Sequence, residues 1–545
     1  MKIYYFILFF LGYNLNSKGQ KVIYSKMESF SKWRFPPKFE VIGKIQSNIL
    51  VHQFDKRHYL KIFDNDMNQI KKVTLKFIPK NINGITFLKY SNYCTIIWQK
   101  VENQTIVFEY AKINNLGELQ RSVASLDTIN FVNQKGEIGF KTFDLILSED
   151  KSKIAVSKFG IRKDTAIIIS KIFNAELQLI EKNTVKLSDF DARINFFNDL
   201  LINNKGDIVF SVSDNIRGLP VNNFQVFVKK MKTENLYDFS LPFDTIPLFN
   251  PSITIDYHNE EYVLSGFNMD TLKNTMIGIH LSKITFEQTT KKGAVKNFRF
   301  IKNIAFRKTE DAGNFYGVLD SKIFMRKDGS CSIVAGSINK LNNYYLKDYH
   351  YPFGQLRNGQ YLYTNRGDDV LNGIDMSNGY LSLLNPIKVE YVLGNEPNLL
   401  QTSPSSFDQS FGGHVSVDNK VENTMSDIAL LHINKDGSLK NDTTIQIPKE
   451  IAFKEQKTTF INSSLNFYTI LLDEKNINII AFTKNLNNQF LLNEFKIFND
   501  GKVESNLIKA KYQYYYNLQA AKQVASNELI IPFFRINKMG FAKVY

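Results

Sequence analysis

The sequence predicts an all-β protein, a β-propeller of four-stranded antiparallel blades. Residues 142–187 contain four short runs rich in β-branched and aromatic residues, each ended by Asn, Asp, Gly or Lys. Variants of this repeat recur along most of the chain, whereas helical periodicity is confined to one short candidate, residues 518–524. A repeated antiparallel four-strand meander is the blade unit of propellers.

The repeats follow one another in chain order. The first five cover residues 40–77, 84–126, 142–187, 198–243 and 252–288, with the last strand of the fifth expected at 284–288. The seventh covers residues 467–510, and the tail adds strands at 527–534 and 540–545. We expect residues 21–27 to supply the outer strand that the tail lacks, so that the N- and C-terminal strands together close the ring. This arrangement favours eight blades, with seven as the alternative.

The sixth repeat is split. Residues 321–337 resemble the inner hairpin of a blade, and residues 426–447 resemble its two outer strands. The insert between them, residues 337–424, is far longer than the roughly 12–15 residues beyond which structureless loops are uncommon. We therefore expect residues 20–545 to form a single propeller domain that carries this insert within its sixth blade.

Two local patterns recur within the repeats. The inner hairpin has an apolar strand, a polar turn and a second strand that is almost continuously apolar, as expected for a strand buried on both faces. The outer hairpin has a turn rich in Asn, Asp and Gly, the residues that tolerate positive φ. Such turns occur within residues 61–70, 112–119 and 171–177.

Residues 1–19 have the order of a signal peptide. Lys2 is followed by the apolar run Ile3–Leu11, and Ser17 and Gly19 are small residues at the −3 and −1 positions before Gln20. The run is too short to span a bilayer, and we find no later segment apolar enough to form a transmembrane helix. We expect cleavage after Gly19 and a secreted protein, located in the periplasm or outside the cell.

The formal net charge is +15, but the basic residues are spread through the sequence rather than clustered. This distribution is typical of a solvated surface, and we expect no nucleic-acid partner. The two cysteines, Cys94 and Cys331, lie in distant repeats, so we expect buried free thiols rather than a disulfide. We expect a monomer.

The inner hairpins, such as residues 147–157 and 325–335, resemble blades of TolB-like and WD-repeat propellers. Together with the signal-like N-terminus and the closing residues 528–545, they resemble uncharacterised secreted propeller proteins of Bacteroidota-type bacteria. This resemblance implies the fold and the compartment. It implies no activity, because propellers carry enzymes, scaffolds and binding modules alike.

Motifs for chemistry are absent from the sequence. Asp64, Asp66 and Asn68 have the alternation of a calcium loop, but Gln69 and Leu75 stand where such a loop needs Gly and Glu. A hairpin turn explains these residues equally well. We find no zinc pattern and no nucleophile motif, and we expect no metal or cofactor.

Two functional hypotheses remain open. The first is a binding or scaffold propeller that recognises a protein or glycan partner through its loops and the 337–424 insert. The alternative is a hydrolase or lyase with acid and base residues at the mouth of the central channel; the sequence leaves open whether the protein is an enzyme. Aromatic and Arg side chains suit recognition surfaces. The insert residues expected to contact a partner are Tyr344, Tyr345, Tyr349, His350, Tyr351, Arg357, Tyr361, Tyr363, Arg366 and Asp368.

Overall fold

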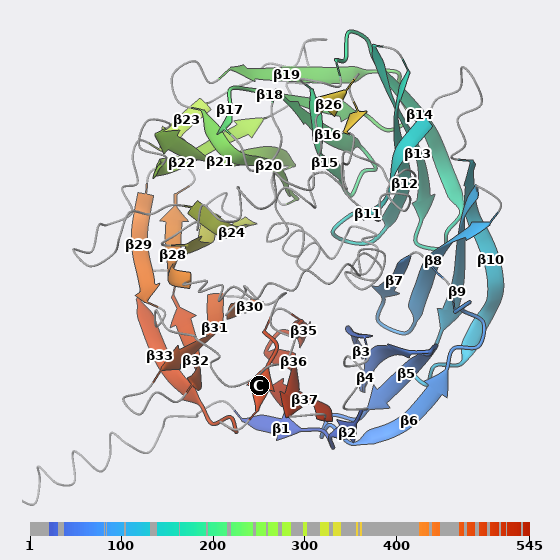
Figure 1. The fold of residues 1–545 in the computed structure, drawn as a ribbon, viewed down its shortest axis with the longest axis vertical. Helices are drawn as coiled ribbons and strands as arrows, with labels where there is room; N and C mark the ends of the chain where they lie inside the picture. Colours follow the sequence, from blue (N-terminus) through green and yellow to red (C-terminus); the bar gives the residue numbers. More distant parts are fainter. Residues whose placement is uncertain are drawn as a thin grey trace, which may run out of the picture. The chain divides into compact units, whose positions relative to one another are not determined.

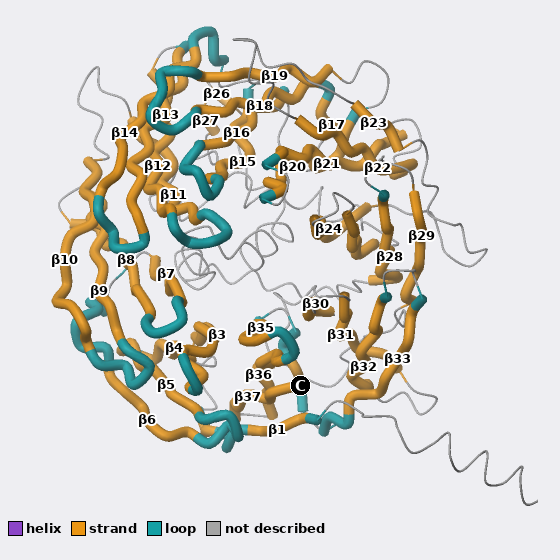
Figure 2. The backbone as a smooth tube through the Cα atoms, turned by 180° about the vertical axis from the view of Figure 1, so that it is seen from behind, coloured by secondary structure: helices purple, strands orange, loops and turns teal. Residues whose placement is uncertain are grey.

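The structure is a computed structural model, and it describes most of the chain from residue 21 onward. Not described are residues 1–20, 31–37, 81, 83, 103–104, 131–138, 163, 192–194, 215–219, 243–246, 258–259, 271–274, 285–297, 302–316, 326–330, 339–355, 358–359, 362–424, 435–438, 447–467, 473–476, 485–489, 499–501, 512–513, 519 and 536–537. The expected signal peptide therefore lies outside the described residues. The described part consists of strands and loops (Figure 2) and contains no helix that could cross a membrane. The predicted all-β class is confirmed.

The described strands form eight sheets of four to six strands and one two-stranded hairpin. They group into two compact units. Unit 1 comprises residues 1–75, 115–117 and 466–545, and unit 2 comprises residues 76–114 and 118–465. The prediction of one domain over residues 20–545 stays a prediction.

Unit 1 contains three sheets, all antiparallel. Sheet B consists of β3 (Lys38–Ile45), β4 (Asn48–Asp55), β5 (Arg57–Phe63) and β6 (Gln69–Thr74). Sheet I consists of β30 (Tyr468–Leu472), β31 (Ile477–Lys484), β32 (Phe490–Ile497) and β33 (Val503–Ile508). Sheet A combines β1 (Val22–Tyr24) and β2 (Glu28–Ser29) with β34 (Tyr515–Tyr516), β35 (Lys522–Ala525), β36 (Glu528–Arg535) and β37 (Lys538–Val544).

Unit 2 contains the remaining sheets in chain order, and Figure 1 labels most of their strands. Sheet C has β7 (Gly84–Lys89), β8 (Cys94–Glu102), β9 (Thr105–Ile113) and β10 (Leu119–Asn130), and sheet D has β11 (Gly139–Leu147), β12 (Lys153–Arg162), β13 (Thr165–Asn174) and β14 (Leu179–Leu187). Sheet E has β15 (Phe196–Ile202), β16 (Ile208–Ser213), β18 (Asn223–Lys229) and β19 (Leu236–Pro242). Sheet F has β17 (Pro220–Val221), β20 (Leu248–Asp256), β21 (Glu261–Asp270), β22 (Thr275–Ile284) and β23 (Phe298–Ile301). Sheet G has β24 (Gly317–Met325), β25 (Cys331–Ile338), β28 (Met425–Ile433) and β29 (Leu439–Gln446).

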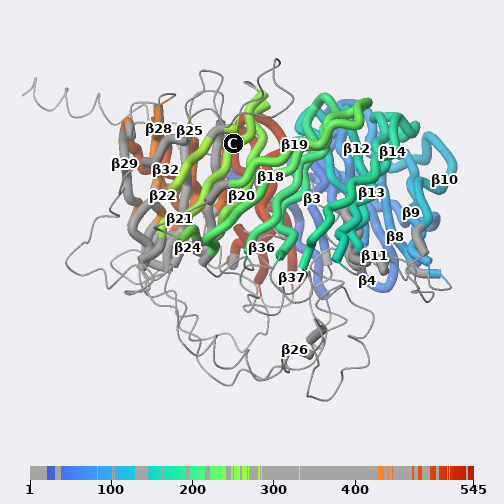
Figure 3. Tube along the Cα trace, turned by 90° about the horizontal axis from the view of Figure 1, so that it is seen from above, coloured from blue at the N-terminus to red at the C-terminus, as the bar shows by residue number. Residues whose placement is uncertain are grey.

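The second strand of a sheet is buried on both faces, as its apolar sequence predicts. All six residues of β16 are buried, and so are the first six of β4. The sheets of unit 2 lie side by side in chain order (Figure 3), and buried side chains fill the layers from C to D, from D to E and from E to F. In unit 1, one such layer joins sheets A and B. Cys94 and Cys331 are buried free thiols, as predicted.

Four hairpin turns share one geometry. In each, the side-chain oxygen of the first turn residue accepts the backbone N–H of the residue four positions later, with N···O distances of 2.8 or 2.9 Å. The residue just before that donor has positive φ, as in a three-residue hairpin loop. The turns begin at Asp64, Asn114, Asn174 and Asn203, and the positive-φ residues are Met67, Gly117, Leu177 and Gly206. The Asp64 carboxylate also accepts Asp66 N–H, so these residues form a hairpin turn.

The structure places two of the less regular segments. In sheet F the strand after β22 is β23, at 298–301; of the predicted strand 284–288, Ile284 ends β22 and residues 285–288 lie outside the described residues. Within the helical candidate 518–524, residues from Lys522 onward form strand β35. There, pairing with β36 overrides a weak local periodicity.

The N-terminal strand β1 pairs with the C-terminal strand β37, with Val22 opposite Val544 and Tyr24 opposite Ala542. Backbone hydrogen bonds between Lys21 and Tyr545 extend this ladder. The tyrosine hydroxyls of Tyr24 and Tyr516 are 2.8 Å apart. Residues 21–27 thus join the C-terminal sheet, as the sequence predicts.

Candidate functional site

The structure places few of the partner-binding residues predicted from the sequence. Residues 339–424 lie between β25 and β28, which pair within sheet G. Arg357 and Tyr361 lie in the hairpin of β26 (Leu356–Arg357) and β27 (Gln360–Tyr361), where they occupy neighbouring rungs. The other predicted residues, Tyr344, Tyr345, Tyr349, His350, Tyr351, Tyr363, Arg366 and Asp368, lie outside the described residues.

A cleft of about 330 Å³ lies between sheets D and E of unit 2. Its apolar lining is Leu187, Phe190, Val212, Phe227 and Leu236, and its polar lining is Lys186, Ser188, Asp189, Asn195, Gln225 and Asp238. This volume is at the lower end of the range of small-molecule sites, roughly 300–1,000 Å³. The cleft is therefore the candidate site that the described residues support.

One wall of the cleft is the connection from β14 to β15. Asp189 has φ of +59°, a left-handed conformation that Asp tolerates better than most residues. The next residue, Phe190, donates its backbone N–H to the carbonyl of Asp164, with an N···O distance of 2.8 Å. Asn195 N–H donates to the carbonyl of Asp191 at the same distance. These bonds fix the backbone next to Asp189 and at Asn195 on the cleft wall.

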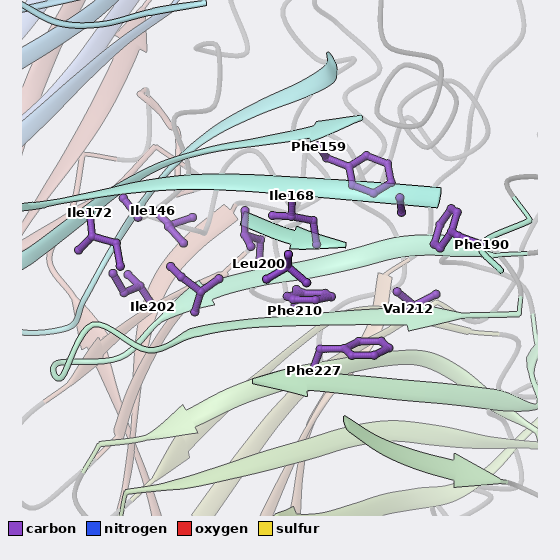
Figure 4. Packing of buried hydrophobic residues seen from close by; sticks show 14 residues of the cluster. Ile146, Phe159, Ile168, Ile172, Phe190, Leu200, Ile202, Phe210, Val212 and Phe227 are labelled. Carbon is purple, nitrogen blue, oxygen red and sulfur yellow. The ribbon is translucent and has the colours of Figure 1, made fainter. Parts of the chain in front are cut away.

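A column of five phenylalanines lies between the two sheets, and the two rings that end it, Phe190 and Phe227, line the cleft. Ring centroids lie 5.9 Å apart for Phe190 and Phe159, 4.7 Å for Phe159 and Phe197, and 5.6 Å for Phe197 and Phe210. Phe210 and Phe227 are 4.9 Å apart and nearly parallel. Figure 4 shows Phe159, Phe190, Phe210 and Phe227 in this layer. Such pairs add about 0.5–1.5 kcal/mol each beyond burial, so both ends of the column present fixed aromatic groups to the cleft.

The opposite wall follows from the strand register of sheet E. Asp238 on β19 pairs directly with Phe227 on β18, and cross-strand neighbours share a face of the sheet. Gln225, two residues before Phe227, lies on that face as well, and its amide donates to the Ser240 hydroxyl across 3.4 Å. A carboxylate and an amide therefore lie on the same face of the sheet as Phe227, which is itself only 8% exposed.

Most polar side chains of the cleft are exposed to solvent and can reach a ligand. Asp189, Asp238, Gln225 and Lys186 are all exposed. Within the described part of the chain, neither carboxylate forms an ion pair. The cleft can therefore offer carboxylate acceptors, an amide and an ammonium group to a ligand over an apolar floor. The described residues contain no group of three His, Cys, Asp or Glu side chains placed to hold a metal ion.

The strongest pKa shifts lie away from this cleft. In unit 1, His52 and His58 are buried, with His52 Nε2 3.0 Å from His58 Nδ1. Burial, and then the charge of His58, lower the pKa of His52 to about 3. In unit 2, burial lowers the pKa of His280, which bonds the Ser282 hydroxyl, to about 4. His52 and His280 are therefore neutral core residues at pH 7, which favours a structural role for both.

Sequence reasoning missed the cleft residues. They come from two stretches, 186–195 and 212–238, that meet only when sheets D and E pack. Gln225 and Asp238 occupy alternating polar positions on strands, which in a sequence are indistinguishable from ordinary solvent-facing positions. The one sequence signal that could have indicated the cleft is the connection after residue 187, which contains Asp189, Phe190 and Asp191.

Comparison with known proteins adds only distant similarity. No protein-family model and no curated protein matches the chain. The polysaccharide lyase Uly1 is 8% identical over 85% of this chain and 89% of its own, with a TM-score of 0.35. An apocarotenoid oxygenase mutant from Synechocystis is 7% identical over 95% and 88%, with a TM-score of 0.28. The catalytic domain of a Coprinopsis cinerea GH62 α-L-arabinofuranosidase is 10% identical over 49% of this chain and 87% of its own, with a TM-score of 0.24. We take no residue role or activity from these similarities.

Proposed function

We propose that the protein is an exported β-propeller that binds glycans, with the cleft between sheets D and E as a sugar site. The observation that carries the proposal is the composition of this cleft, where two carboxylates and two amides line the cleft together with a mostly buried apolar surface. Sugar hydroxyls need such acceptors and donors. The volume of about 330 Å³ suits one or two sugar units rather than a protein segment.

Eight of the described sheets have at least four strands, and β1 pairs with β37. We propose that these sheets are eight blades and that the terminal pairing closes the ring by covering the edge of β37 in the last sheet. Export follows from the signal-like order of residues 1–19. N-terminal sequencing of the exported protein should begin at Gln20, and a retained Met1 would exclude this processing.

We propose that the 337–424 insert extends the binding surface. Its attachment points, Ile338 and Met425, lie at the end of sheet G where the second strand leads to the third. In an antiparallel meander this is also the end where the fourth strand finishes, as β14 does in sheet D beside the cleft. The aromatic and Arg residues of the insert, including Tyr344 and Arg366, would then contact the same partner as the cleft.

The alternative function is a glycan hydrolase or lyase. One observation favours it: Asp189 and Asp238 line the same cleft, and glycoside hydrolysis uses a pair of carboxyl groups. The two readings differ in outcome, because an enzyme releases new reducing ends or unsaturated products from the glycan it binds. A binding protein leaves the glycan unchanged after prolonged incubation.

The test is binding to an immobilised panel of neutral, amino and acidic glycans. Gln225→Trp should fill the cleft and reduce binding at least tenfold, because the exposed position accommodates the ring without disturbing the core. Thr184→Trp, exposed on β14 but outside the cleft, is the matched control. Both variants should melt as the wild type does. Unchanged binding by Gln225→Trp, or no binding to any glycan by the wild type, would exclude the sugar site.

A further inference from the structure

The cleft between sheets D and E has the opposite charge to the chain as a whole. The chain has a formal charge of +15, whereas the cleft lining contains two carboxylates, Asp189 and Asp238, and one ammonium group, Lys186. We propose that the cleft selects a sugar carrying a protonated amine, an amino sugar being the simplest such ligand. This inference rests on the glycan-binding function proposed above.

The two carboxylates approach the ligand from opposite walls. Asp189 belongs to the connection after β14, held by the bond from Phe190 N–H to the Asp164 carbonyl. Asp238 belongs to β19 and lies directly across from Phe227. Since neither forms an ion pair within the described part of the chain, a bound ammonium group would be their first strong cationic partner. Charge-assisted hydrogen bonds of this kind are roughly twice as strong as neutral ones.

The apolar lining does not distinguish between the sugars. Phe190 and Phe227 line the cleft but are only 5% and 8% exposed, so they add apolar contact rather than an open ring face. An anionic sugar would gain the packing but meet two carboxylates, with only Lys186 to offset them. Amino sugars should therefore bind most tightly and uronic acids least.

Calorimetric titration of the full chain with three monosaccharides tests the inference. At pH 6 and low salt, methyl glucosaminide should bind at least tenfold more tightly than methyl N-acetylglucosaminide, which is neutral. Methyl glucuronide should bind most weakly. The preference should fall severalfold in 0.5 M NaCl, because salt screens charges that remain exposed to solvent.

Two charge-removing variants locate the effect. Asp189→Asn and Asp238→Asn should each reduce the ratio of the two affinities, amine over N-acetyl sugar, and together bring that ratio within about twofold. Glu234→Gln, which removes an exposed carboxylate of the turn before β19, is the matched control and should leave the preference intact.

Equal affinity for the amine and the N-acetyl sugar would overturn the amine inference and leave the glycan site standing. A preference that survives both Asp substitutions would also overturn it. Failure of all three monosaccharides to bind overturns the inference as well, whereas the glycan panel with Gln225→Trp decides the sugar site separately.

Discussion

The buried histidine pair of sheet B predicts an acid-sensitive unit 1. His52 on β4 and His58 on β5 are only 5% and 4% exposed, and their rings stack with centroids 5.2 Å apart. Phe54 packs against His58, with their ring centroids 4.6 Å apart. Adding a proton to His52 would place a charge in this apolar layer, next to a second imidazole. The expected result is that acid stabilises the unfolded chain more than the folded one.

The sign and size follow from the pKa of His52. It is about 3 in the folded protein and 6.5 as the ordinary value, so between these values the unfolded state binds more protons. The stability from a neutral His52 is complete above pH 6.5 and is lost as the pH falls toward 3. At about 1.4 kcal/mol per pH unit, the loss from this group is about 2 kcal/mol at pH 5 and about 3 kcal/mol at pH 4.

The assay is urea denaturation of the wild type and of His52→Gln at pH 7.5, 6, 5 and 4. Glutamine keeps a hydrogen-bonding amide near His58 but does not titrate, so the carboxylates contribute equally to both proteins. His52→Gln can change the free energy of unfolding at pH 7.5 by any amount. Relative to that reference, the difference in free energy of unfolding between the two proteins should shift in favour of the variant by about 2 kcal/mol at pH 5. A difference that is constant from pH 7.5 to 4 would refute the reasoning.

Three further predictions concern stability measured by chemical denaturation. Gly540→Ala should lower the free energy of unfolding by about 1–3 kcal/mol, because the new Cβ would lie 2.6 Å from Cζ of Phe533. The same substitution should cost much less in a Phe533→Leu background, and an equal cost in both backgrounds would contradict this explanation. Lys171→Met should lower the free energy of unfolding by about 3 kcal/mol, because the Asp127 carboxylate, only 5% exposed, loses its ammonium partner. An equal cost in an Asp127→Asn background would be inconsistent with that cause. Leu177→Gly should be destabilising overall. It relieves a positive φ, worth about 1 kcal/mol, but it removes a side chain that is only 7% exposed, worth about 2–3 kcal/mol or more. A net stabilisation would show that the backbone strain dominates.

The class and most strands could be predicted because their information is local. Runs such as 165–173, rich in isoleucine, form strands in any packed context, and turn residues such as Asn174 hydrogen-bond within their own hairpin. The sequence could not show that Met67 and Leu177 take the positive-φ position, since glycine is the usual choice there. Both are nevertheless buried, which shows that packing outweighs the local preference.

The candidate site could not be predicted, since it depends on packing between sheets. Asp189 and Asp238 lie in different sheets, and nothing in either local sequence indicates the other. The sequence directed attention instead to the insert, where aromatic residues such as Tyr344 and Tyr351 are concentrated. Those residues remain a prediction, whereas the cleft rests on described geometry.

The pairing of Val22 with Val544 has a consequence for how the protein reaches its folded state. Sheet A needs segments from both ends of the chain, so it is completed only after the last strand has been synthesised and, if the protein is exported, translocated. Contacts of such long sequence separation form slowly, and an open strand edge invites association with other chains in the meantime. Until then, β1 lacks the partner that β37 will later supply. We therefore expect association of unfinished chains through β1 to compete with folding until β37 is in place.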